Sequence, residues 1–94
     1  MYGLFVFVYD YSVKIVWDEI KRQQNIAKHG MNFADLDDAF FERALVMPSN
    51  SRRSVAIGIF KGVVIVAVVY RRLGSEAVSV ISMRRASRKE RKIL

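Results

Sequence analysis

The pattern of apolar and polar positions predicts a strand and then a helix early in the chain. Residues 14–17 form a short, mostly apolar run that is typical of a strand. Asp18 is suited to cap the helix that follows, and Gly30 is suited to end it, because glycine readily adopts the left-handed conformation found there. Within this helix we expect Ile20 and Ala27 to share the buried stripe.

A second helix is predicted over roughly residues 33–41. Asn32 can cap it, and Phe33, Leu36 and Phe40 follow the i, i+3, i+7 spacing of one helix face. We therefore expect these three aromatic or aliphatic side chains to face the core, with the acidic residues of the segment turned to solvent.

The second half of the chain predicts three strands and a terminal helix. Residues 55–59 alternate large and small side chains, and residues 63–69 form an unbroken apolar run that is typical of a central strand. Residues 77–81 predict the last strand, and tight turns are expected at residues 61–62 and 73–75. The order indicates an α+β fold: a mostly antiparallel sheet of three to four strands, two N-terminal helices packed on one face, and a basic C-terminal helix.

Charge is distributed very unevenly along the 94 residues. Residues 1–50 carry five basic and seven acidic side chains, whereas residues 51–94 carry eleven basic and two acidic ones. Six basic residues fall within residues 84–92, with Glu90 as the acidic exception. Like charges at this density repel one another, so the second half favours a polyanionic partner, either nucleic acid or an acidic protein.

Composition argues against several other classes of protein. The chain has no cysteine and one histidine, so we expect neither a metal nor a cofactor. The acidic side chains of Asp35, Asp37 and Asp38 are better explained by a solvated surface near a helix N-terminus. No run approaches the roughly 18 apolar residues that cross a bilayer, and residues 1–8 lack the basic start of a signal peptide. The cytoplasm is the expected compartment, without a membrane partner.

Three segments resemble one family. They are WDEIK with Asn25 and KHGMNF over residues 17–33, VVY over residues 68–70, and ISMRRASRKER over residues 81–91. This combination resembles the BrnT ribonuclease toxins of type II toxin–antitoxin systems over residues 14–92. The resemblance implies a RelE-like fold, metal-free RNA cleavage that inhibits translation, and neutralisation by a BrnA-like ribbon–helix–helix antitoxin, through which alone the complex binds operator DNA.

Two positions depart from the family pattern. Ser79 stands where the family usually has Arg, and Leu73 where it often has Arg. The alternative function is therefore a catalytically weakened relative that acts as an antitoxin-binding co-repressor or as a nucleic-acid-binding module. Residues 1–13 have no counterpart in the family, so we expect them to be a non-native extension of a single domain over residues 14–94.

The residues suggest how RNA could be cleaved without metal. Such cleavage needs proton transfer and cations that stabilise the charged phosphorane. His29 suits proton transfer because imidazole titrates near neutral pH, although capping the end of its helix is an equally simple role. A helix over residues 84–92 would place Arg84, Arg88 and Arg91 on one face. The catalytic candidates are His29, Lys28, Arg84 and Arg88, and the RNA-binding candidates are Lys21, Arg71, Arg72, Arg85 and Arg91.

The same reasoning assigns expected places to other residues. Glu90 is expected to pair with a neighbouring arginine. Tyr70, near the end of the predicted central strand, either packs in the core or stacks on a base. Trp17 is expected in the core. Lys21, Asn25 and Lys28 recur at i, i+4, i+7 and are expected to form a polar stripe on the first helix.

Overall fold

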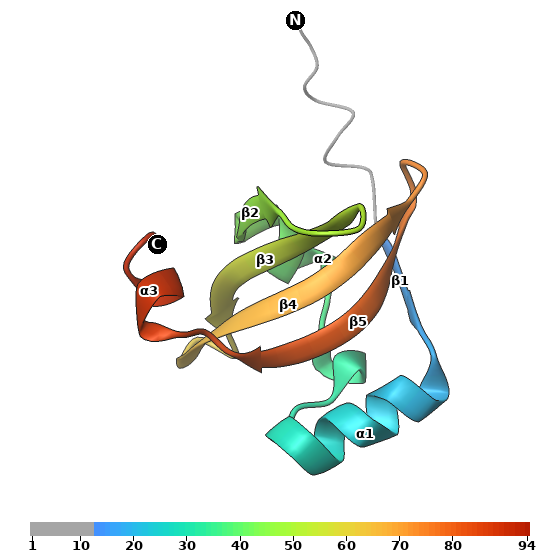
Figure 1. Ribbon diagram of the computed structural model, residues 1–94, viewed down its shortest axis with the longest axis horizontal. Coiled ribbons are helices and arrows are strands. Elements are labelled where there is room, and N and C mark those ends of the chain that lie inside the picture. The colour runs from blue at the N-terminus through green and yellow to red at the C-terminus, as the bar shows by residue number, and fades with distance from the viewer. Residues whose placement is uncertain (1–12) are drawn as a thin grey trace, which may run out of the picture.

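The strands within residues 13–94 form one mixed sheet (Figure 1). The computed structural model describes residues 13–94, so the expected extension lies almost entirely outside the described residues. The strands are β1 (Lys14–Trp17), β2 (Leu45–Pro48), β3 (Arg53–Phe60), β4 (Val64–Leu73) and β5 (Ala77–Arg85), in the order β1-β5-β4-β3-β2. β1 runs parallel to β5, and all other neighbours are antiparallel.

The α+β class and the mostly antiparallel sheet are confirmed, but the predicted count of three to four strands is wrong. The strand missing from the prediction is β2, which pairs with β3 at the edge of the sheet. It has four residues, ends in Pro48 and adjoins a turn-forming segment, so its apolar run is too short to predict a strand from the sequence. An edge strand tolerates proline because one side of it has no strand partner that needs the missing N–H.

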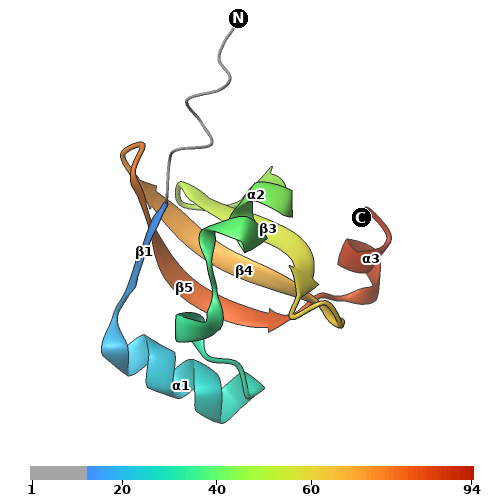
Figure 2. The ribbon, with the colours of Figure 1, turned by 180° about the vertical axis from the view of Figure 1, so that it is seen from behind.

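The helices are α1 (Glu19–His29), the 3₁₀ turn η2 (Phe33–Asp35), α2 (Asp38–Arg43) and α3 (Arg88–Arg91). Figure 2 shows α1, η2 and α2 on the same side of the sheet. The single helix predicted over residues 33–41 is wrong, because Asp37 adopts an extended conformation and caps α2 by accepting the Phe40 N–H at 2.9 Å. The caps at Asp18 and Gly30 are confirmed, and Asn32 caps η2.

The main core lies between these helices and the sheet. Phe33, Leu36 and Phe40 are buried in it, as their spacing predicted, and they meet side chains of β4 and β5 such as Val68. Tyr70 belongs to the same core: it is 4% exposed, and its ring centroid lies 5.2 Å from that of Phe41. Base stacking by Tyr70 is therefore ruled out. Trp17 packs against the core, as expected.

Helix α1 docks through its polar side, which contradicts the predicted buried stripe. Ile20 is 67% exposed and Ala27 is also exposed, whereas Asn25 is 5% exposed. Asn25 Nδ2 donates to the carbonyls of Met83 and Met31, both at 2.9 Å, and its Oδ1 accepts the Met83 N–H at 3.0 Å. β1 pairs with β5 only as far as Val80, so Asn25 replaces the missing strand neighbour at Met83.

The basic segment near the C-terminus is not one helix. β5 continues to Arg85, and α3 has only four residues, closed at its start by a capping box between Ser87 and Glu90. The predicted stripe of Arg84, Arg88 and Arg91 is therefore wrong, because Arg84 belongs to the strand. Ala86, which is 3% exposed, anchors this segment in a second small cluster with Ile57 and Ala67.

Candidate functional site

One face of the sheet has no helix from the first half of the chain packed on it. Side chains alternate along a strand, so the residues of β4 between the buried Val66, Val68 and Tyr70 point to the opposite side from α1 and α2. We call this side the open face; it is turned toward the viewer in Figure 1, with α3 at one end. Arg71 and Arg84 lie on this face. Arg71 directly follows the buried Tyr70 on β4, and Arg84 lies opposite Ala67 on the neighbouring strand.

Arg84 is held by a carboxylate. Its Nη1 and Nη2 donate to the two oxygens of Glu90 at 2.8 and 3.0 Å, which confirms the expected pairing of Glu90 with an arginine. The Glu90 carboxylate also accepts the Ser87 N–H at 2.8 Å. The hydrogen bonds from Arg84 outweigh the opposing effect of burial and, with those from Ser87, lower the pKa of Glu90 from 4.5 to about 2. Arg84 is thus largely neutralised, and the pair ties α3 to β5.

Two other arginines on the open face have no such partner. Arg53 on β3 lies directly opposite Arg71 on β4, and Arg71 in turn lies opposite Ser79 on β5. Neither arginine forms an ion pair within residues 13–94. Arg53 is half-buried, and its Nε is buried without a hydrogen-bond partner among those residues. Arg53 is not among the residues predicted from the sequence, because only the strand register brings it beside Arg71.

The remaining predicted residues do not gather with these. Lys21 and Lys28 are exposed on α1, and His29 is half-buried in its last turn. Arg72 and Arg85 lie opposite Val78 and Val66, on the helix-covered side of the sheet. Arg88 and Arg91 lie on α3, where Arg91 Nη1 donates to the Ala86 carbonyl at 2.9 Å. The structure therefore divides the predicted set between two sides of the sheet, instead of placing it in one cluster.

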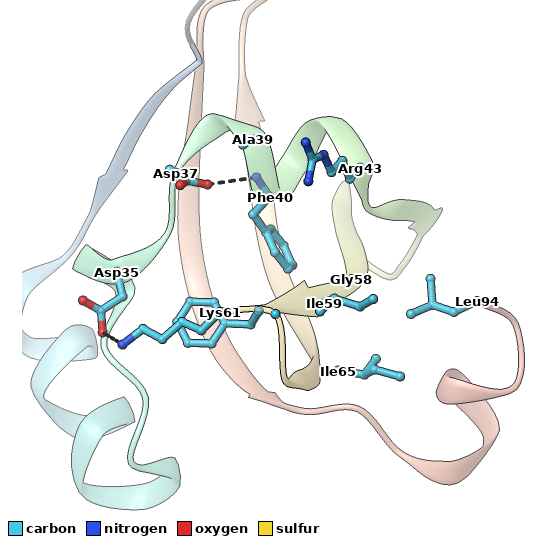
Figure 3. A pocket seen from close by; sticks show the side chains of 12 residues that line it. Asp35, Asp37, Ala39, Phe40, Arg43, Gly58, Ile59, Lys61, Ile65 and Leu94 are labelled. Carbon is cyan, nitrogen blue, oxygen red and sulfur yellow. Dashed lines mark hydrogen bonds and ion pairs between the residues drawn. The ribbon is translucent and has the colours of Figure 1, made fainter.

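A groove of about 670 Å³ lies elsewhere, between α2, the end of the β3–β4 hairpin and Leu94. Figure 3 shows apolar side chains such as Ile59 and Ile65 along it, and the Asp35 carboxylate paired with Lys61 Nζ at its border, at 3.3 Å. None of the catalytic or RNA-binding candidates lines this groove.

Other kinds of site would need clustered metal ligands or a membrane-spanning helix. Among residues 13–94, no three His, Cys, Asp or Glu side chains gather closely enough to hold a metal ion. In the same part of the chain, every helix is too short or too polar to span a membrane.

Comparison with known proteins links this arrangement to a family. The model of the family described as "Ribonuclease toxin, BrnT, of type II toxin-antitoxin system" matches residues 17–90. The chain is also similar to the Brucella abortus ribonuclease toxin BrnT, known from a crystal structure, with 58% identity and a TM-score of 0.76. This match covers 81% of the present chain and 99% of the Brucella one. Among curated proteins, no sequence matches.

Proposed function

This chain belongs to the BrnT family of ribonuclease toxins of type II toxin–antitoxin systems, and on that premise we propose that it is a cytoplasmic endoribonuclease. It cleaves RNA without a metal ion, inhibits translation and is neutralised by a BrnA-like antitoxin, through which the complex reaches operator DNA. The observation that carries the proposal is the family match over residues 17–90, which runs from the end of β1 through α1, α2 and strands β2 to β5 into α3. We assign the fold to the RelE-like class on the same basis.

The charge of the molecule supports an RNA substrate. The chain has a net charge of +7, and the strongly basic second half supplies β3, β4, β5 and α3. RNA binding of this kind depends on phosphate contacts, whose strength falls as salt rises. The exposed lysines and arginines of α1, β4, β5 and α3 offer a path for a single strand of RNA around the end of β5, which has no β1 partner beyond Val80.

We assign the chemical roles to residues along this path. His29 transfers a proton, and the adjacent Lys28 stabilises the negative charge that develops on the phosphate. Both lie in the last turn of α1, shortly after Asn25, which hydrogen-bonds to Met83 of β5. Arg88 contributes positive charge near the start of α3, and Arg84 contributes its charge when an RNA phosphate displaces the Glu90 carboxylate from it. Further phosphate contacts are assigned to Lys21, Arg71, Arg72, Arg85 and Arg91.

Purified protein provides the direct test. We expect it to cleave single-stranded RNA equally well with and without a chelator, and we expect His29→Ala and Lys28→Ala to slow cleavage by a factor of about 10² or more. Gln24→Ala is a matched control, because Gln24 is exposed on the same helix and has no assigned role. Cleavage that requires a divalent metal, or that survives both substitutions, would contradict the assigned mechanism.

One observation favours a second function. Arg84 is already neutralised by Glu90, and Ser79 offers no positive charge beside Arg71. A protein with a weakened active site would then serve as a co-repressor that binds the antitoxin. Induced expression without an antitoxin separates the two functions: the nuclease arrests growth and degrades RNA, whereas the co-repressor is harmless but strengthens operator binding by the antitoxin.

A further inference from the structure

We propose that Arg53 and Arg71 form a clamp for one phosphate group of the RNA strand, on the open face of the sheet. This inference rests on the proposed function, because it names where that substrate is held. It also adds Arg53, which no sequence pattern selected, to the residues that contact RNA.

The strand register places the two guanidinium groups together. Arg53 and Arg71 are direct partners in the antiparallel β3–β4 pair, and partners of this kind have Cβ atoms about 4.5–5.5 Å apart on the same face. Two like charges at directly opposite positions destabilise a sheet. A bound anion between them would remove this cost, and a phosphate oxygen can accept hydrogen bonds from both planar guanidinium groups.

Among residues 13–94, no carboxylate pairs with either arginine of the clamp. Each described ion pair lies elsewhere: Arg22 with Glu19, Lys61 with Asp35, and Arg84 with Glu90. The contrast with Arg84 is informative, because that arginine shares the open face and receives both oxygens of a carboxylate. Arg53 and Arg71 are therefore the two strand arginines of this face whose charge an external ligand can neutralise.

The local surroundings suit a fixed rather than a mobile arginine. Arg53 is half-buried, and its Nε is enclosed without an acceptor in the described part of the chain, so the protein restricts the side chain without satisfying it. An unpaired buried donor is unfavourable, and a small rotation toward a bound oxyanion would satisfy it. The next cross-strand pair on the same face is Val55 and Val69, both half-buried. It offers an apolar surface to the sugar or base of a bound nucleotide.

The clamp is tested by salt-dependent binding of a fluorescent single-stranded RNA oligonucleotide. Each of Arg53→Gln and Arg71→Gln should weaken binding about tenfold or more at low salt. Each should also flatten the slope of log affinity against log salt by roughly 0.7. Arg43→Gln is the matched control, because it makes the same charge change on exposed α2, on the opposite side of the sheet. Arg53→Lys keeps the charge, so it should keep the slope while losing affinity, because lysine lacks the planar fork.

A second measurement separates a folding defect from a binding defect. Inorganic pyrophosphate should raise the melting temperature of the wild-type protein and of Arg43→Gln more than chloride does at equal ionic strength, because it binds only the folded clamp. Arg71→Gln, at an exposed position, should melt at or slightly above the wild-type temperature in chloride, because it removes the like-charge pair, and should lose the pyrophosphate effect. This readout remains usable if Arg53→Gln does not fold.

The outcomes distinguish the clamp from the proposed function. Wild-type protein that binds no RNA at any salt concentration would overturn the proposed function and, with it, RNA as the occupant. Wild-type binding and cleavage that Arg53→Gln and Arg71→Gln leave at the level of Arg43→Gln would overturn the clamp alone. Variants that keep RNA binding but lose an acidic antitoxin would also overturn it, and would assign the two arginines to a protein contact.

Discussion

Replacement of Asn25 by alanine should remove a large part of the stability of this protein. The side chain is 5% exposed and makes three hydrogen bonds, two to Met83 and one to Met31. Each such bond contributes about 1 kcal/mol net, and the backbone groups left unpaired in a buried place add to the loss. We therefore expect Asn25→Ala to lower the free energy of unfolding by about 3–4 kcal/mol, a large fraction of the roughly 5–15 kcal/mol of a typical domain.

Urea unfolding followed by circular dichroism measures this loss, and hydrogen exchange locates it. The Met83 amide should exchange much faster in Asn25→Ala, because its acceptor is gone. Gln24→Ala is the control; Gln24 is the exposed neighbour in α1, and the change should stay within about 0.5 kcal/mol of wild type. If Asn25→Ala matched this control in stability and in Met83 exchange, the role of Asn25 as a substitute strand neighbour would be refuted.

Three other substitutions test separate contacts. Glu90→Gln should cost about 1–2 kcal/mol at pH 7, less than the pKa of about 2 alone would give, because Arg84 is 36% exposed and solvent screens the pair. Since the folded pKa of Glu90, about 2, lies below the unfolded value of 4.5, this stabilisation is complete about one pH unit above 4.5 and is lost as the pH falls through the folded pKa, so wild type and variant should converge in urea unfolding only near or below pH 2. Gly58→Ala should cost about 1–3 kcal/mol by the same assay, because its Cβ would lie 3.1 Å from Phe40 Cε1; an unchanged midpoint would mean that this ring moves freely. Ser79→Arg would add a cation in register with Arg71, so RNA binding should tighten and its salt slope should steepen by roughly 0.7, and a flat response would place the RNA elsewhere.

Local patterns in the sequence determined much of the fold, because they depend on neighbouring residues only. Asp18 and Gly30 mark the ends of α1, since a helix end needs a side-chain acceptor at its start and a left-handed residue after it. The apolar spacing of Phe33, Leu36 and Phe40 predicted their burial, although the helical conformation is interrupted at Asp37. The three motif segments also indicated the family, which the comparisons confirm.

The tertiary structure alone decided which residues meet. Asn25 is buried and the apolar Ile20 is exposed. The reason is that β1 pairs with β5 only up to Val80, so the backbone of β5 at Met83 needs another hydrogen-bond partner. Arg53 and Arg71 face each other because of the β3–β4 register, and no helical or strand periodicity reports a pairing between separate strands. Strand register and the pairing of strand edges depend on hydrogen bonds across the whole sheet. The local sequence therefore does not reveal which residues they bring together at the candidate site.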